Sequence, residues 1–138
     1  IGKMPENVEI PENMICAGLV RDPVKLSEYY SMADVFLNPS VQETFGKTTA
    51  EAMSCGTPVI VYHTTACTEL VGPGCGEVVD NMAAHEYLNT VREYLKKPKN
   101  SDSCRQFAEK NFAYHDLCSQ YMELISRLYL SCERRNRT

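Results

Sequence analysis

Two carboxylates flank a glycine in the segment "QETFGKTTAE", in which seven residues separate Glu43 from Glu51 and include Phe45 and Gly46. A carboxylate accepts hydrogen bonds from hydroxyl groups, and a glycine lets the backbone approach a ligand closely. The residues after Gly46 are typical of a helix start, whose free N–H groups attract anions, above all phosphate. Two carboxylates beside a phosphate-binding turn would suit a nucleotide sugar.

The same residues also allow a plainer interpretation. Acidic side chains favour the first turns of helices because of the helix macrodipole, so Glu51 would then be an ordinary solvated position. The ligand-binding interpretation requires the N–H groups of Lys47, Thr48 and Thr49 to be free at the helix start. A bulky residue at Gly46 is then expected to block binding and to leave the fold intact. The spacing alone leaves both interpretations open.

Short apolar runs predict the strands that would position this segment, at residues 14–19, 34–40, 58–63 and 77–80. Helices are expected between them, one opening at Asp22-Pro23, one over residues 46–54 and a short one over 66–71. Gly56 is placed to end the second of these helices. The remaining chain is predicted to be helical, with Leu88, Val91 and Leu95 on one helix and residues 104–112 on the next. A long final helix carries the apolar positions Leu117, Tyr121, Leu124, Ile125 and Leu128.

Strands that alternate with helices predict an α/β fold of three layers, with a parallel sheet between helices on both faces. In an open parallel sheet, ligands bind at the carboxyl ends of the strands. The segment "SVQETFGK" follows the second predicted strand and therefore lies at that edge.

Composition sets limits on the function. A chain of 138 residues, 43% apolar and 23% charged, is typical of one soluble domain, here 1–138. The net charge of −4 gives no basic field of the kind that nucleic-acid binding needs, so no nucleic-acid partner is expected. The seven cysteines form no CxxC pair, which favours reduced, mostly buried thiols in a cytoplasmic protein and no structural metal.

Three elements recur in fixed order in this chain: "ADVFLNPS", the two glutamates with "FG" between them, and "EAMSCGTPVI". On these motifs the chain resembles the C-terminal, donor-binding domain of the family 4 glycosyltransferases, which are retaining enzymes of the GT-B architecture. The resemblance extends more weakly through "TELVGPGCGEVVD" and the final helices. It implies a Rossmann-like domain that forms the C-terminal half of a GT-B fold.

The resemblance also implies roles for individual residues. Glu43 would contact hydroxyls of the transferred sugar and is the catalytic candidate, and Glu51 would accept the ribose hydroxyls. Phe45, Gly46, Lys47 and Thr48 would line the sugar and the diphosphate through their backbone. The substrate would be a nucleotide diphosphate sugar, with no further cofactor and no metal.

Two departures from the family pattern affect what is expected. Lys47 stands where the family has an apolar residue, and it either adds charge to the diphosphate site or reaches into solvent. The family's basic pair for the leaving diphosphate has no match before Met14, so the domain is expected to be incomplete at its N-terminus and to be a fragment of a larger two-domain enzyme. The isolated chain is then expected to transfer nothing.

The predicted parent enzyme moves a hexose to a glycan or lipid-linked acceptor, held by an N-terminal domain, in surface polysaccharide or glycoconjugate synthesis. That acceptor class allows peripheral membrane association of the full-length enzyme. Two alternatives stay open, a GT-B sugar-nucleotide epimerase and a non-catalytic α/β interaction domain. Five further residues are assigned other roles. Tyr29 and Tyr30 are assigned to core packing instead of stacking on a base. Cys67 is not expected to be a nucleophile, Glu69 is assigned to a helix start, and His63 is assigned to no site.

Overall fold

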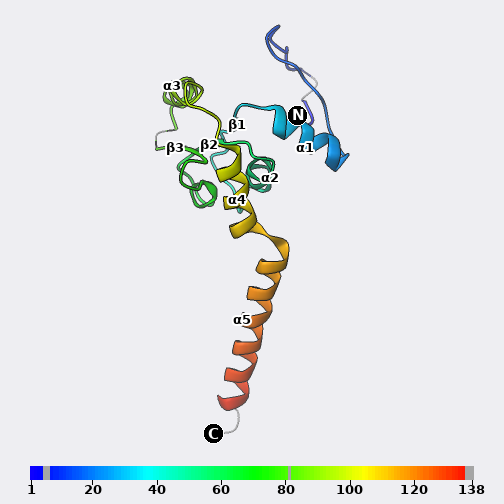
Figure 1. The fold of residues 1–138 in the computed structure, drawn as a ribbon, viewed down its shortest axis with the longest axis vertical. Coiled ribbons are helices and arrows are strands. Elements are labelled where there is room, and N and C mark those ends of the chain that lie inside the picture. Colours follow the sequence, from blue (N-terminus) through cyan, green and yellow to red (C-terminus); the bar gives the residue numbers. More distant parts are fainter. Residues whose placement is uncertain (5–6, 81, 136–138) are drawn as a thin grey trace.

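A three-stranded parallel sheet in the order β1-β2-β3 lies in the globular part of the molecule, from which α5 extends (Figure 1). The computed structural model describes residues 1–4, 7–80 and 82–135. Its elements are α1 (Pro23–Met32), β1 (Phe36–Asn38), α2 (Lys47–Ser54), β2 (Val59–Tyr62), the 3₁₀ turn η1 (Cys67–Leu70), β3 (Gly76–Val79), α3 (Ala84–Tyr94), α4 (Ser101–Phe112) and α5 (Tyr114–Arg135). The strands expected at 34–40, 58–63 and 77–80 are thus confirmed.

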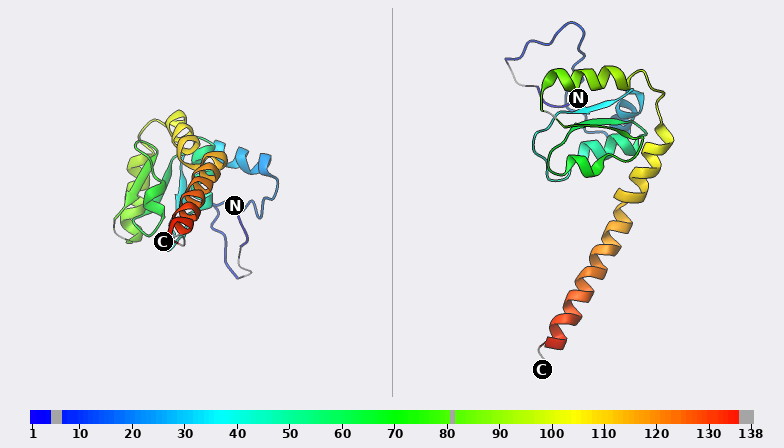
Figure 2. Two further views of the ribbon diagram at one scale, coloured as in Figure 1. Left: turned by 90° about the horizontal axis from the view of Figure 1, so that it is seen from below. Right: turned by 90° about the vertical axis from the view of Figure 1, so that its left-hand side faces the viewer.

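The central strand β2 is buried on both faces, as its unbroken run of β-branched residues predicts. Alternate residues of a strand point to opposite faces of a sheet. The residues packed on one face include Val59, Val61, Met53 of α2 and Cys104 of α4. Those on the other face are Ile60, Tyr62, Val79 and, from α3, Tyr87 and Tyr94. Helices therefore cover both faces of the sheet (Figure 2), and the predicted three-layer α/β fold is confirmed.

Local signals fix the ends of the first two helices. The Asp22 side chain accepts a hydrogen bond of 2.9 Å from the N–H of Val24, and Pro23 is the first residue of α1. Gly56 follows the end of α2 with a φ of +78°, a left-handed conformation that glycine adopts without strain. Both predicted helix ends are confirmed.

The strand expected at residues 14–19 is wrong. These residues form no strand, and the side chains of Met14, Ile15 and Leu19 are 63%, 94% and 62% exposed. A strand is stable only when a neighbouring strand satisfies its backbone groups, and the only described pairs are β1 with β2 and β2 with β3. Gly18 instead takes a φ of +67°, and its carbonyl accepts the N–H of Gly2.

The buried face of α3 also differs from the one expected. Leu88 and Leu95 are each 51% exposed, whereas Tyr87 and Tyr94 are buried and Val91 packs against them. Tyr87 can be buried because its hydroxyl is satisfied: it donates to the carbonyl oxygen of Ile60 over 2.6 Å.

The final helix is confirmed as a long amphipathic helix, but its apolar positions are exposed. Figure 1 shows α5 leaving the body of the molecule, and Tyr121, Leu124 and Leu128 are between 52% and 64% exposed. Among the described helices, including α5, none combines the length and the apolar character needed to cross a membrane.

The cysteines divide into three environments. Cys67, Cys75 and Cys104 are buried and Cys55 is half-buried, which agrees with the expected burial. That expectation is wrong for the exposed residues, which are Cys16, Cys118 and Cys132. Two of these lie on α5, where no element among the described residues covers them.

Gly76 should be essential for pairing between β2 and β3. A Cβ atom at this position would lie 1.9 Å from the carbonyl oxygen of Val59, which is its partner in the ladder. We expect Gly76→Ala to lower the free energy of unfolding by about 3 kcal/mol or more in urea titration. Gly18→Ala is the control, because a Cβ atom there would have no described atom within 4 Å and only the backbone cost of about 1–2 kcal/mol applies. Equal losses in the two variants would contradict the assigned contact.

Candidate functional site

A buried hydrogen bond connects the carboxyl end of β1 to the first turn of α2. Asn38, the last residue of β1, is 8% exposed, and its side-chain nitrogen donates to Thr49 Oγ1 over 2.9 Å. Its side-chain oxygen accepts the N–H of Ser40 over 3.2 Å. Asn38 therefore fixes both the start of the loop 39–46 and the position of the helix that follows it.

The connection after β2 holds the same loop from the other side. The Thr65 hydroxyl donates to the carbonyl of Glu43 over 2.7 Å and accepts the N–H of Glu43 over 2.9 Å. The Thr64 hydroxyl donates to the carbonyl of Ser40. The backbone at Glu43 is thus pinned, and its half-buried carboxylate projects from a fixed point at the carboxyl edge of the sheet.

Gly46 forms the turn into α2 with a φ of +82°, in the left-handed region. A Cβ atom here would lie 2.8 Å from Leu70 Cδ1, in addition to the backbone strain. A bulky residue at Gly46 therefore carries a cost in stability, from the backbone strain and from the contact with Leu70, and the expectation that it would leave the fold intact stays a prediction. Phe45 before the turn packs edge-on against Phe112 of α4, at 5.8 Å between ring centroids.

The start of α2 leaves fewer N–H groups free than the sequence predicts. The N–H of Thr49 donates to the carbonyl of Gly46 over 2.9 Å, so it is satisfied within the turn. Lys47 and Thr48 are the first two residues of α2, where backbone N–H groups have no partner inside the helix, and both residues are exposed. Two N–H groups, rather than three, can therefore meet an anion here.

Glu51 is held by one partner on each carboxylate oxygen. The Tyr30 hydroxyl of α1 donates to Oε2 over 3.1 Å, and Lys47 Nζ lies 3.6 Å from Oε1. Glu51 is the fifth residue of α2, beyond the first turn in which the macrodipole favours acidic residues. The plainer interpretation of this position therefore loses its main physical support.

A groove of about 520 Å³ runs beside Glu51. Its lining comes from α1, α2, Phe45 and the junction of α4 with α5, and consists of Pro23, Leu26, Ser27, Tyr30, Phe45, Lys47, Ala50, Glu51, Ser54, Cys55, Phe112, Tyr114 and Leu117. The structure thus brings Phe45, Lys47 and Glu51 together around one groove. Glu43, Gly46 and Thr48 do not line it, so a cleft shared by both carboxylates stays a prediction.

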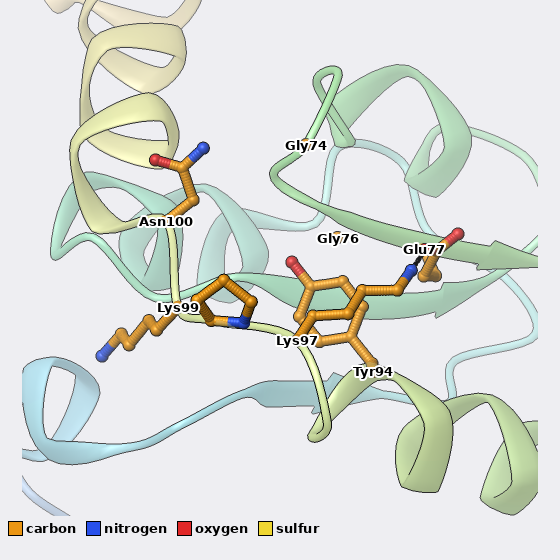
Figure 3. Close-up of a pocket in the computed structure, with 8 residues that line it drawn as sticks. Gly74, Gly76, Glu77, Tyr94, Lys97, Lys99 and Asn100 are labelled. Atoms are coloured by element: carbon orange, nitrogen blue, oxygen red, sulfur yellow. Dashed lines mark hydrogen bonds and ion pairs between the residues drawn. The ribbon is translucent and has the colours of Figure 1, made fainter.

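A second pocket, of about 590 Å³, lies at the start of β3, away from the carboxyl edge of the sheet (Figure 3). The charged groups that line it already have partners in the protein. Lys97 Nζ lies 2.6 Å from Glu77 Oε1, and Lys99 Nζ donates to the carbonyls of Ser31 and Ala33. These contacts hold β3 and the end of α1 in place and give the pocket a structural role.

The residues to which the sequence assigns other roles are also placed. Tyr30 is buried and packs edge-on against Phe36, as expected, but its hydroxyl also contacts Glu51. Burial raises the pKa of the Cys67 thiol, which disfavours the nucleophilic thiolate. His63 Nδ1 lies 2.8 Å from Asp80 Oδ1 on the exposed surface. Within the described residues, no group of three or more His, Cys, Asp or Glu side chains is placed to hold a metal ion.

Sequence reasoning did not find Asn38, Thr65 or the hydroxyl of Tyr30. A polar residue at the end of a buried strand is a usable signal for Asn38, because such a group needs a buried partner. The contacts of Thr65 and Tyr30 join residues 22 and 21 positions apart in the chain and have no local pattern.

Thr49→Val tests the bond on which this arrangement depends. The substitution keeps the shape of the side chain but leaves the buried Asn38 nitrogen without its acceptor, so we expect a loss of about 1–3 kcal/mol in the free energy of unfolding. Thr48→Val is the matched control, because Thr48 is exposed one position earlier in the same turn and should change stability by no more than about 0.5 kcal/mol. Chemical denaturation measures both, and similar values would show that the Asn38 contact is unimportant.

Comparison with known proteins gives the family. Residues 2–111 match the model of the glycosyl transferases group 1 family. A GDP-mannose-dependent alpha-(1-6)-phosphatidylinositol dimannoside mannosyltransferase of Mycobacterium tuberculosis is 33% identical over 82 residues, 59% of this chain and 21% of that protein. A D-inositol 3-phosphate glycosyltransferase of Thermobifida fusca is 30% identical over 97 residues, 66% of this chain and 22% of that protein.

A third relative, an alpha-galactosylglucosyldiacylglycerol synthase of Streptococcus pneumoniae, is 43% identical over 51 residues, 37% of this chain and 13% of that protein. The chain thus spans about a fifth or less of the length of these relatives. The family match covers α1, Glu43, Glu51 and nearly all of α4, and it ends before the groove residues Phe112, Tyr114 and Leu117. The chain therefore belongs to the glycosyl transferases group 1 family of glycosyltransferases.

Proposed function

We propose that this chain binds the nucleotide diphosphate sugar donor of a retaining glycosyltransferase. One arrangement supports the proposal, and all of its residues lie within the family match. Gly46, in a left-handed conformation at the carboxyl edge of the parallel sheet, starts α2. The Glu51 side chain of α2 lines a groove. Parallel sheets bind ligands at this edge. The name of the mycobacterial relative, which includes GDP-mannose, supports a donor of this class.

The diphosphate would lie at the start of α2. The N–H groups of the exposed residues Lys47 and Thr48 and the Lys47 ammonium would supply positive charge there, and Gly46 would allow the close approach. Glu51 would accept the ribose hydroxyls, since its carboxylate lines the groove, and Glu43 would accept hydroxyls of the sugar from the pinned loop. Phe45 lies between the two carboxylates in sequence and lines the groove beside the diphosphate.

Transfer breaks the bond between the anomeric carbon and the diphosphate, so negative charge develops on the leaving group. Fixed backbone donors and a nearby ammonium stabilise such charge without rearrangement during the reaction. The proposal therefore uses no resident metal ion and no cofactor beyond the nucleotide sugar itself. Retention at the anomeric carbon is part of the same proposal.

The acceptor would be a glycan or lipid-linked molecule in surface polysaccharide or glycoconjugate synthesis. The printed names of the relatives support that class, because they include a phosphatidylinositol dimannoside mannosyltransferase and a galactosylglucosyldiacylglycerol synthase. We assign acceptor binding to protein outside these 138 residues, so the chain alone should bind donor without transferring sugar. A cytoplasmic location with its thiols reduced completes the proposal.

The first test is a titration of the 138-residue chain with UDP-, GDP- and ADP-sugars, followed by NMR. We expect shifts centred on residues 43–51 for at least one donor, and this donor identifies the base. Absence of binding to every donor at millimolar concentration would overturn the proposed function. Sugar transfer catalysed by the isolated chain would overturn the assignment of the acceptor to other protein.

The two carboxylates give a sharper test, because they are assigned to opposite ends of one ligand. Glu51→Gln should weaken both the free nucleotide diphosphate and the nucleotide sugar, because both carry the ribose. Glu43→Gln should spare the free nucleotide and weaken mainly the nucleotide sugar. Loss of a hydrogen bond to a charged group corresponds to roughly 1.5–3 kcal/mol, so each selective loss should reach about tenfold in Kd.

Each variant serves as the control for the other in this comparison. Glutamine at position 51 keeps an acceptor for the Tyr30 hydroxyl, so the contact between α1 and α2 should persist. Equal weakening of both ligands by both variants, measured by calorimetry or NMR, would refute the assignment to opposite ends.

A further inference from the structure

The two oxygens of the Glu51 carboxylate have partners of different kinds. Oε2 accepts a hydrogen bond from the hydroxyl of Tyr30, a residue only 7% exposed. Oε1 faces the ammonium of Lys47, whose side chain is 84% exposed, at 3.6 Å. An ion pair of this length contributes little when one partner, here Lys47, lies in solvent, because water screens its charge. One oxygen is therefore firmly held and the other is only loosely covered.

Tyr30 is itself fixed from several directions. Its ring packs edge-on against Phe36 of β1, with 5.6 Å between centroids. Its carbonyl oxygen accepts the Thr57 hydroxyl over 2.5 Å and the Ala33 N–H over 3.2 Å. The ring and the backbone of Tyr30 are therefore both held in place, and with them the hydroxyl that donates to Glu51.

The Tyr30 hydroxyl also remains a donor at any ordinary pH. Burial and the neighbouring Glu51 charge raise the pKa of Tyr30 to about 12. Tyr30 and Glu51 both line the groove, so the held carboxylate is presented to whatever occupies it.

We propose that Tyr30 is a positioning residue for the donor. Its hydroxyl holds Oε2 of Glu51 in place, so that Oε1 points to the ribose hydroxyls after the Lys47 ammonium has moved away from it. This inference rests on the proposed function and deepens it. Lys47 can be displaced because its contact is weak, and the diphosphate assigned to the start of α2 would offer its ammonium a stronger partner.

A purely structural alternative is that the bond between Tyr30 and Glu51 only fastens α1 to α2. The two helices are also joined by a hydrogen bond of 3.5 Å from the Ser31 hydroxyl to the Cys55 carbonyl, and Leu26 and Cys55 pack against the shared core. The two roles differ in their consequence for ligands. Only positioning predicts an effect specific to the ribose hydroxyls.

The experiment compares Tyr30→Phe with the unaltered chain, using UDP, GDP and ADP and their 2′,3′-dideoxy counterparts as probes. The unaltered chain should bind at least one ribonucleotide about tenfold more tightly than its dideoxy form, as expected for a lost hydrogen bond to a charged group. Tyr30→Phe should weaken the ribonucleotide about three- to tenfold and leave the dideoxy form unchanged, so the preference for ribose nearly disappears. Tyr29→Phe, the same change one residue earlier on α1, should keep the preference.

The outcomes separate this inference from the function on which it rests. The positioning role would be overturned if Tyr30→Phe kept the preference for the ribonucleotide over its dideoxy form. It would also be overturned if Tyr30→Phe weakened both forms equally, or if it lowered the Tm and left the ratio of the two Kd values unchanged. If the unaltered chain bound the ribonucleotide and its dideoxy form equally, Glu51 would not contact the ribose hydroxyls, and this inference would be overturned. Donor binding through the diphosphate would be unaffected by that result. An unaltered chain that binds no diphosphate would overturn the proposed function itself.

Discussion

The hydrogen bond between Asn38 and Thr49 sets the distance between the end of β1 and the first turn of α2. Both groups are buried, so breaking the bond would leave a polar atom without a partner in the core. The loop 39–46 must span this fixed gap, and it ends in a left-handed turn at Gly46 that no side chain could replace without contacting Leu70. The position of the first turn of α2, with the N–H groups of Lys47 and Thr48, follows from this one constraint.

A second set of hydrogen bonds also holds the loop 39–46. Thr64 and Thr65, in the connection after β2, bind the loop backbone at Ser40 and Glu43. The loop is thus held by its own strand and by the neighbouring one, which parallel pairing places side by side. Binding sites held by packed elements lose less conformational entropy when a ligand arrives. The arrangement suits a ligand that must contact the loop at several points at once.

Much of the fold follows from local signals in the sequence. The Asp22-Pro23 helix start, the Gly56 helix end and the apolar run of β2 each work within a few residues, and all three predictions are confirmed. Residues 14–19 have the same apolar character, yet they form no strand because pairing requires a neighbour that no local pattern can guarantee. Tyr87 of α3 shows a related limit, since its buried hydroxyl depends on a distant acceptor, the Ile60 carbonyl.

The candidate site also combines residues that the sequence indicated with residues that only the structure revealed. Glu43, Gly46 and Glu51 are recognisable from spacing and residue type, because the motif is contiguous in the sequence. The residues that hold them, Thr65 and Tyr30, are joined to the site only by the fold. Sequence patterns therefore indicated the candidate groups, while the contacts that orient these groups became visible only in the tertiary structure.

The exposed helix α5 has a consequence for the dynamics of the chain. A helix of 22 residues is about 33 Å long, and its side chains from Tyr114 through Cys132 are all exposed. Isolated helices are marginal in water, because most helical stability comes from tertiary packing. Local pairs such as Glu123 with Arg127 add only a little. Amide hydrogens should therefore exchange with solvent deuterium progressively faster along α5, away from its junction with α4, while those of β2 exchange slowest.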